Sequence, residues 1–220
     1  MSPGSRDLVT VDTGVEAGPG AARGVNAIVS QGRALQQKGL WPAGGPRLLH
    51  RLRQAIGGPR ILLKRDDLTG LGLGGNKSRK LEFLLGDALR RGADTIITSG
   101  GILTNHGRLT AAACAKLGLA CYLVFTEDEN GVYEGNRILQ TMFGAKQVFC
   151  DNIDHSLPPE KMAKERLRAG EETIAKLAGR LRAEGKTPYV IPRGGRSLYG
   201  TASYVAAMDE VKAQLEERNL

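Results

Sequence analysis

The chain has 220 residues, of which 41% are hydrophobic and 25% are charged, and its formal net charge is +8 at pH 7. No apolar run approaches the roughly 18 residues that a membrane helix requires, and residues 1–24 lack the apolar centre of a secretory signal, so we expect a cytoplasmic protein with no membrane partner. Basic and acidic residues are mixed along the chain and only one tryptophan is present, which argues against a nucleic-acid partner.

The first 92 residues are predicted to form a leader, a helix, a short strand and a second helix. Residues 1–34 are rich in small residues without a sustained period and are predicted to be a flexible leader. The segment PRLLHRLRQAIGG predicts a helix closed by its two glycines, because its apolar residues recur at helical spacing, at Leu48, Leu49, Leu52 and Ile56. RILLKRDD predicts a short strand. SRKLEFLLGDALRRGA then predicts an amphipathic helix that ends at Gly92 and faces inward through Leu81, Leu84, Leu85 and Ala88.

From residue 95 onward, predicted strands and helices alternate. The strands are TIITS, ACYLVF, KQVFC and TPYVIP. The helices are TNHGRLTAAACAKLGL, GNRILQTMFGA, the basic segment 161–186 and GTASYVAAMDEVKAQLEERN. Strands separated by helices of this length pair in parallel through right-handed crossovers, so the sequence predicts an α/β fold with doubly wound parallel sheets.

The loop GLGLGGNKSRK places a lysine directly behind a run of glycines. Its glycines fit the G-x-G-x-x-G spacing, but a dinucleotide-binding turn has no lysine, and Asn76 separates Gly75 from Lys77 where a P-loop allows no residue. Asp66 and Asp67, just upstream, would repel a triphosphate, so ATP and NAD both fit poorly.

Two interpretations of Lys77 stay open on spacing alone. In the first, its amine forms an imine with a carbonyl compound, which requires a pKa lowered by burial or by nearby charge such as that of Arg79 and Lys80. Lys80 lies about one helical turn further on and can approach the same ligand. In the second, Lys77 is an ordinary solvated residue near a helix start.

A second candidate site is SGGILTNHGR, where a strand enters a glycine turn and the next helix begins near Thr104. Amides at a helix start attract anions, and Thr104, Asn105 and His106 add a hydroxyl, an amide and an imidazole. The alternative is that Thr104 or Asn105 only caps the helix and His106 lies on its surface.

The remaining polar features are weaker candidates for a functional site. IPRGGRSLYGTASY is a third glycine-rich turn between a strand and a helix. It either contributes hydroxyls to the same ligand site as the two loops above, from Ser197, Tyr199 and Thr201, or is only a tight connection. No second ligand stands at metal spacing from His50 or His155, so we predict no metal site. The three cysteines have no C-x-x-C spacing and are predicted to be reduced thiols in apolar surroundings, at Cys114, Cys121 and Cys150.

Taken together, GGNKSRKLE, GGILTNHGR, GNRILQTMFGA, PYVIPRGG and GTASYVAAMDEV resemble the pyridoxal-phosphate enzymes related to D-cysteine desulfhydrase and 1-aminocyclopropane-1-carboxylate deaminase. The resemblance runs from about residue 40 to the end. It implies the tryptophan synthase beta-like fold (fold type II) and pyridoxal 5'-phosphate as cofactor. It also implies a small amino-acid substrate, which loses a β-substituent such as thiolate and then leaves as a keto acid and ammonia.

The resemblance also assigns roles to individual residues. In that family the lysine of GGNK carries the cofactor as an imine, so Lys77 inherits that role and, once released, that of the base. Lys80 is expected to contact the cofactor phosphate, and Asn105 the phenolic oxygen of the ring. Asn76, Thr104, Asn105 and His106 are expected to line the substrate site, with Thr104 meeting the substrate carboxylate or assisting proton transfer. The family usually has Gln and Ser where this chain has Leu103 and Thr104, which leaves the choice of substrate open.

The same resemblance sets the expected domain organisation. Residues 35–80 and 190–220 are expected to form part of a large cofactor domain, and 81–189 a small substrate domain. Members of the family continue into a phosphate-binding cup and the partner of the pyridine nitrogen, so we expect a split enzyme whose second protein subunit supplies that part. A truncated chain and a non-catalytic binding or assembly subunit are the alternatives, and homo-oligomer formation stays open.

Overall fold

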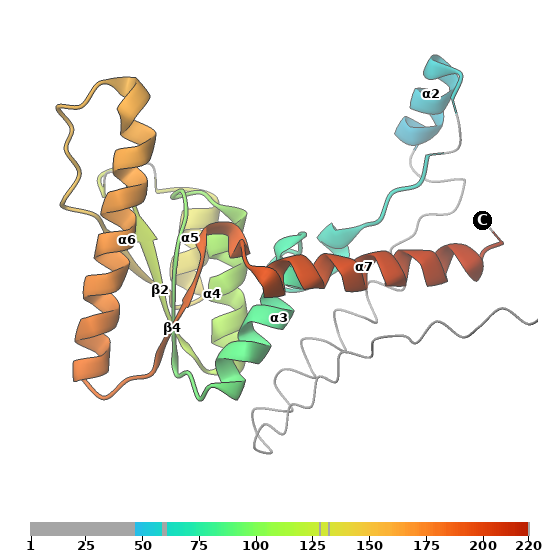
Figure 1. Cartoon of the computed structure of the whole chain (residues 1–220). Coiled ribbons are helices and arrows are strands. Elements are labelled where there is room, and N and C mark those ends of the chain that lie inside the picture. Colours follow the sequence, from blue (N-terminus) through green and yellow to red (C-terminus); the bar gives the residue numbers. More distant parts are fainter. Residues whose placement is uncertain (1–46, 59–60, 128, 132, 220) are drawn as a thin grey trace, which may run out of the picture.

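The computed structural model describes residues 47–58, 61–127, 129–131 and 133–219 (Figure 1). The predicted leader, 1–34, lies outside the described residues. In chain order the helices are α2 (Arg47–Ile56), α3 (Lys77–Arg90), α4 (Asn105–Leu117), α5 (Asn136–Met142), α6 (Pro159–Ala183) and α7 (Leu198–Glu216). The strands are β1 (Thr95–Ser99), β2 (Ala120–Phe125), β3 (Lys146–Phe149) and β4 (Pro188–Ile191), and two short 3₁₀ turns are η1 (Asp66–Leu68) and η2 (Arg193–Gly195). No helix in these ranges is long and apolar enough to cross a membrane.

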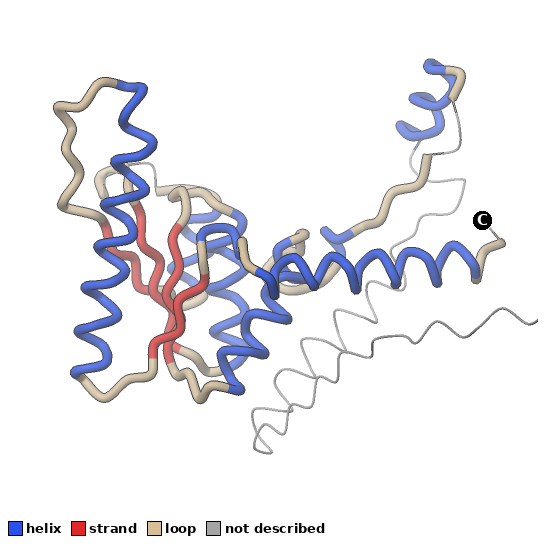
Figure 2. The backbone as a smooth tube through the Cα atoms, in the orientation of Figure 1, coloured by secondary structure: helices blue, strands red, loops and turns tan. Residues whose placement is uncertain are grey.

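The four strands form one parallel sheet in the order β3-β2-β1-β4, which confirms the predicted α/β class (Figure 2). Helix α6 covers one face of the sheet, while α3, α4 and α5 lie on the other side. Neighbouring residues of β1 point to opposite faces, as the pleat of a strand requires. Ile96 packs with α3 and α4 residues such as Leu84 and Leu109, and Ile97 packs with α6 residues such as Leu177.

The predicted inward face of α3 is confirmed, because four side chains are each at most 2% exposed: Leu81, Leu84, Leu85 and Ala88. Helix α2 also forms where predicted and is followed by Gly57 at φ 62°. Its apolar residues Leu52 and Ile56 are 45% and 60% exposed, so no described part of the chain covers them.

The strand predicted for RILLKRDD was wrong. Residues 61–65 join none of the four paired strands, and Asp66–Leu68 forms the 3₁₀ turn η1. A strand needs a neighbour with which to share its hydrogen bonds. Here the β pairing is limited to an isolated bridge at Lys64, whose Nζ also donates to Gln214 Oε1 at 2.7 Å and forms an ion pair with Glu210 of α7.

Helix α7 packs along α3 and then projects away from the sheet (Figure 1). Its buried residues are Gly200, Ser203, Ala207 and Gln214. Its other face exposes large apolar side chains: Leu198 is 90%, Val205 62% and Met208 63% exposed. Within the described residues, this face of α7 has no partner.

Candidate active site

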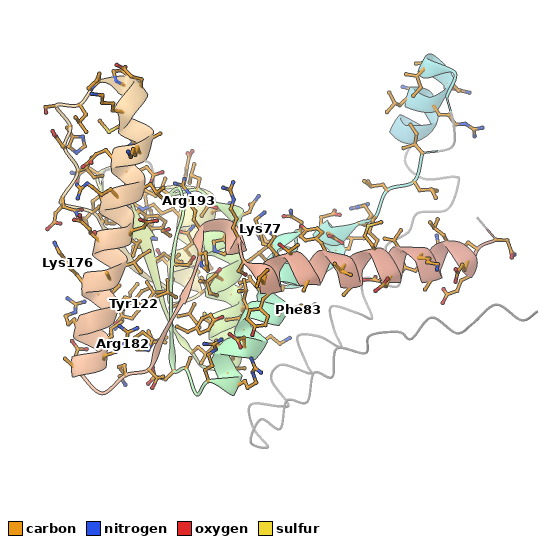
Figure 3. The ribbon with its side chains drawn as sticks, viewed as in Figure 1. Lys77, Phe83, Tyr122, Lys176, Arg182 and Arg193 are labelled. Carbon is orange, nitrogen blue, oxygen red and sulfur yellow. The ribbon has the colours of Figure 1, made fainter. Side chains whose placement is uncertain are left out.

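The glycine loop delivers Lys77 to the end of the sheet where the strands finish. Helix α3 runs antiparallel to β1, so its first residue, Lys77, lies at the carboxyl edge of the sheet, near the start of α4. Figure 3 shows Lys77 and Arg193 at this same end of the molecule. The Lys77 ammonium makes a hydrogen bond of 3.4 Å to the Oδ1 of its neighbour Asn76 and no ion pair with a carboxylate of the described residues.

The shape of this loop depends on glycine. Gly74 has φ 72°, and its amide donates to Leu71 O while Gly75 donates to Asp66 O. A side chain at Gly74 would lie 2.5 Å from the carbonyl carbon of Asp67. The loop is therefore folded tightly against η1, which fixes the point at which α3 begins.

Lys80 lies one turn further along α3, beneath the loop that follows β4. Its Nζ donates to Gly194 O at 3.3 Å and lies 5.8 Å from the ring centre of Tyr204. Burial lowers the pKa of Lys80, and the charges of Lys77 and Arg196 lower it further. The site thus gathers positive charge that no described carboxylate neutralises.

Arg79 does not belong to this group, contrary to its expected influence on Lys77. Its side chain is 5% exposed and pairs with both oxygens of Asp66, at 2.8 and 2.7 Å, and with Glu210 at 3.0 Å. Asp67 is likewise paired, with Arg65. The carboxylates upstream of the loop are therefore neutralised by arginines.

The start of α4 brings the second predicted group together. Thr104 is the N-cap, since its hydroxyl accepts the amide hydrogen of His106 at 3.2 Å, as the capping interpretation predicted. Asn105 is the exposed first residue of the helix. The first amides of a helix have no acceptor within it, so this end of α4 can bind an anion.

His106 is buried rather than on the helix surface. Its ring Nε2 lies 2.9 Å from Thr98 Oγ1, and that hydroxyl donates to Ile191 O at 2.8 Å. Nε2 must therefore carry the hydrogen, which leaves Nδ1 as an acceptor without a partner among the described residues. Burial, together with the charges of Lys77 and Lys80, lowers the pKa of His106 to about 4, so the ring is neutral at pH 7. Thr98 was missed from the sequence because it is a strand residue whose partners lie on α4 and β4.

The third glycine-rich turn borders the site through Gly194, whose carbonyl oxygen accepts from Lys80, while its hydroxyl residues serve the connection itself. Ser197 caps α7 by accepting the Gly200 amide hydrogen at 3.1 Å, Thr201 donates to Ser197 O, and Tyr199 accepts from Arg90. His155 is exposed in a loop, and among the described residues no cluster of metal-ligating side chains occurs. The cysteines are unpaired, and Cys114 and Cys121 are buried as predicted, while Cys150 is half-buried.

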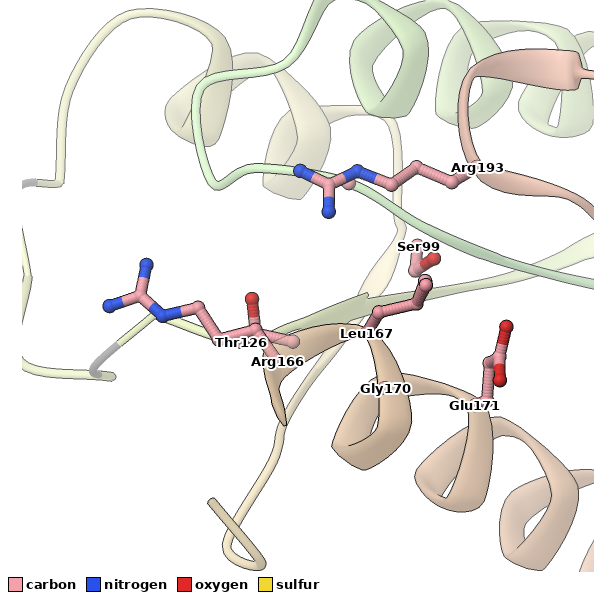
Figure 4. A pocket seen from close by; sticks show the side chains of 8 residues that line it. Ser99, Thr126, Arg166, Leu167, Gly170, Glu171 and Arg193 are labelled. Atoms are coloured by element: carbon pink, nitrogen blue, oxygen red, sulfur yellow. The ribbon is translucent and has the colours of Figure 1, made fainter. Parts of the chain in front are cut away.

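A small open pocket lies between the end of β1 and α6 (Figure 4). It is lined by Ser99, Gly100, Thr126, Arg166, Leu167, Gly170, Glu171 and Arg193. None of the site residues predicted from the sequence lines it. The predicted residues instead lie at the starts of α3 and α4.

Comparison with known proteins gives a consistent result. Residues 42–219 match the family model described as "Pyridoxal-phosphate dependent enzyme". The chain is 44% identical to D-cysteine desulfhydrase of Yersinia enterocolitica over 162 residues, which is 71% of this chain and 45% of the relative. It is 42% identical to D-cysteine desulfhydrase of Serratia proteamaculans over 168 residues, or 74% of this chain and 47% of the relative.

A solved structure is also similar. The crystal structure of an ACC deaminase homologue superposes with a TM-score of 0.62 at 42% identity, covering 76% of this chain and 46% of that one. The chain spans about half the length of the relatives that it matches.

Proposed function

Because the chain belongs to the family of pyridoxal-phosphate dependent enzymes, we propose that it supplies the cofactor-bearing lysine and part of the substrate site of a lyase or deaminase. The substrate is a small amino acid, either one with a β-thiol as in D-cysteine or a cyclopropane amino acid. This choice rests on relatives named D-cysteine desulfhydrase and on a structure named as an ACC deaminase homologue. The observation that carries the proposal is the pair of lysines, Lys77 and Lys80, which lie beside the start of α4 and have no carboxylate partner in the part of the chain that the structure describes.

The residues present fit this cofactor, which is an aldehyde with a phosphate group. A bound amine must be neutral to form an imine, and positive surroundings favour the neutral amine. Lys80 has a lowered pKa because of burial and its cationic neighbours, so this edge of the sheet favours added negative charge. Lys77 Nζ would hold the aldehyde carbon, and Lys80 would face the phosphate.

Pyridoxal phosphate, when bound, withdraws electrons from a substrate amino acid and makes its α-hydrogen acidic. Lys77 Nζ would be released when the substrate amine takes its place on the aldehyde carbon, and the freed amine would then accept this proton. The Thr104 hydroxyl accepts the His106 amide and so keeps its own hydrogen for the substrate carboxylate, which the α4 amides also attract. Asn76 lies beside Lys77 and is exposed to the same space. The neutral His106 adds no charge that would compete for the carboxylate.

We further propose that residues 81–189 act as the substrate domain, and that 35–80 and 190–220 contribute to a cofactor domain completed by a second polypeptide. Support comes from the exposed apolar face of α7, where Leu198, Val205 and Met208 have no described partner. We place the activity in the cytoplasm, because unpaired cysteines are typical of a reducing compartment.

The test is to trap the cofactor. The protein is incubated with pyridoxal 5'-phosphate, reduced with borohydride and mapped by mass spectrometry, alone and in its native assembly. We expect a pyridoxyl group on Lys77, and none at position 77 in Lys77→Arg. A matched control is Lys176→Arg, since Lys176 lies exposed on α6 on the far side of the sheet (Figure 3).

Two results would change the interpretation. No adduct on Lys77 in the assembly would refute the proposal and favour a non-catalytic binding or assembly subunit. An adduct on the isolated chain, at the same affinity as in the assembly, would refute the need for a second polypeptide.

A further inference from the structure

The side-chain amide of Asn105 is held at one end only. Asn136 Nδ2, from the start of α5, donates to Asn105 Oδ1 at 2.9 Å. Arg108, one turn along α4, donates to the same oxygen from Nη2 at 3.2 Å. Two donors thus converge on Oδ1 and occupy both of its lone pairs.

The polarity of these contacts leaves no choice of orientation. A guanidinium has donors and no acceptor, so the Asn105 atom facing Arg108 must be the oxygen. Asn136 Nδ2 also lies 2.7 Å from the carbonyl oxygen of Leu103, which only accepts, so Asn136 must offer its nitrogen there. The exposed Asn105 is therefore left with its Nδ2 donors directed away from both neighbours, and no described residue accepts from them.

Arg108 is an unusual group to find at this position. It is 6% exposed, burial lowers its pKa, and its Nε and Nη1 have no hydrogen-bond partner among the described residues. Burying a cation with unpaired donors is costly. The Nη2 atom that donates to Asn105 also donates to Gly74 O, at 3.2 Å. It therefore ties the loop that leads to Lys77 to the residue that starts α4.

We infer that Asn136 and Arg108 are positioning residues that lock the Asn105 amide with its nitrogen presented to the ligand. This inference deepens the proposed function and rests on it for the nature of the ligand, which is the anionic ring oxygen of the cofactor. A locked donor does not have to be ordered when the ligand binds, and a reversed amide would present an oxygen to that anion. Arg108 adds a second effect, since it holds this donor at a fixed place relative to the Lys77 loop.

The orientation can be tested without any cofactor, by ¹⁵N NMR of the side-chain amides in the full chain. We expect Asn136 amide hydrogens to exchange slowly, since they serve Leu103 O and Asn105 Oδ1, and Asn105 hydrogens to exchange at the rate of exposed amides. In Asn136→Asp the donor is lost and a carboxylate faces two acceptors, so the Asn105 resonances should shift. Asn152→Asp is the matched control, because Asn152 Nδ2 donates to Glu172 far from Asn105.

The second measurement is the dissociation constant for pyridoxal 5'-phosphate, followed by absorbance in the same assembly. We expect about a tenfold loss of affinity in Asn136→Asp, the effect of one hydrogen bond to a charged group, and less than twofold in Asn152→Asp. If Asn136→Asp does not fold, Asn136→Ser removes the same donor without adding charge.

Slow exchange at Asn105 with fast exchange at Asn136 in the unaltered protein would overturn the inference, as would unchanged Asn105 resonances in the Asn136 variants. Failure of the unaltered protein to bind the cofactor would instead refute the proposed function, and the exchange rates would still decide how the amide is oriented.

Discussion

Replacing Gly74 with alanine should damage both the stability of the protein and its Lys77 loop. The backbone at Gly74 has φ 72°, and a new Cβ would lie 2.5 Å from the carbonyl carbon of Asp67 and closer still to its oxygen. Holding an L residue at positive φ costs about 1–2 kcal/mol, and relieving the overlap by moving packed backbone costs about 1–3 kcal/mol more. The free energy of unfolding should therefore fall by about 2–5 kcal/mol.

Thermal unfolding followed by circular dichroism measures this loss. At about 2–4 °C per kcal/mol for a chain of this size, the midpoint should fall by roughly 4–20 °C. Gly86→Ala is the control, because a Cβ at Gly86, inside α3, would meet no neighbouring side chain or element within 4 Å and should add about 1 kcal/mol through better helix propensity. Equal midpoints for Gly74→Ala and the unaltered protein would show that the loop does not pack on Asp67 as described. That result would remove the argument that Gly74 fixes the start of α3.

Three further predictions concern charge and strain. Burial would raise the pKa of Asp87, but hydrogen bonds from arginine and tyrosine side chains bring it to about 2. Asp87→Asn should thus cost about 2 kcal/mol at pH 7 and little at pH 2 in urea unfolding, and a pH-independent loss would contradict this. For His106, with a pKa of about 4 in the folded state, NMR should show no titration between pH 5.5 and 9. The neutral ring contributes about 3 kcal/mol to the free energy of unfolding, and this contribution is lost as the pH falls from about 6.5 to 4. A titration midpoint of His106 near pH 6.5 in the NMR spectra would refute the burial argument. Leu73 is 74% exposed at φ 69°, so Leu73→Gly should raise the free energy of unfolding by up to about 1 kcal/mol, and a fall would show that the side chain has an unseen contact.

The parts of the fold that depend on local pattern could be predicted from the sequence. The spacing of Leu81, Leu84 and Leu85 predicted the buried face of α3, and TIITS was predicted to be a buried strand, as β1 is. The Gly100–Gly101 turn marked the end of β1, and so placed Thr104 and Asn105 at the carboxyl edge of the sheet. These signals lie within a few residues of the feature that they predict.

The parts that depend on distant residues could not be predicted. RILLKRDD has the composition of a strand, but its pairing depends on neighbours elsewhere in the chain, and Lys64 instead contacts Glu210 of α7. Arg79 follows Lys77 closely in sequence, yet its charge is taken up by Asp66 and Glu210. Asn136 belongs to GNRILQTMFGA, a segment that carries the family resemblance but singles out no residue, and its proposed role follows from its distance to Asn105.

The distribution of ion pairs explains how this edge of the sheet stays positive in spite of acidic residues nearby. Asp66 and Glu210 share Arg79, and Asp67 pairs with Arg65, so the carboxylates of this region are each directed toward an arginine. If any of them faced Lys77 instead, the ammonium would be stabilised and its amine would be a poorer nucleophile. Arginine suits this neutralising role because it stays charged and binds a carboxylate through two parallel hydrogen bonds. In the proposed function the lysines are thereby kept for an anionic ligand, and Arg79 acts by pairing with the acids rather than by touching that ligand.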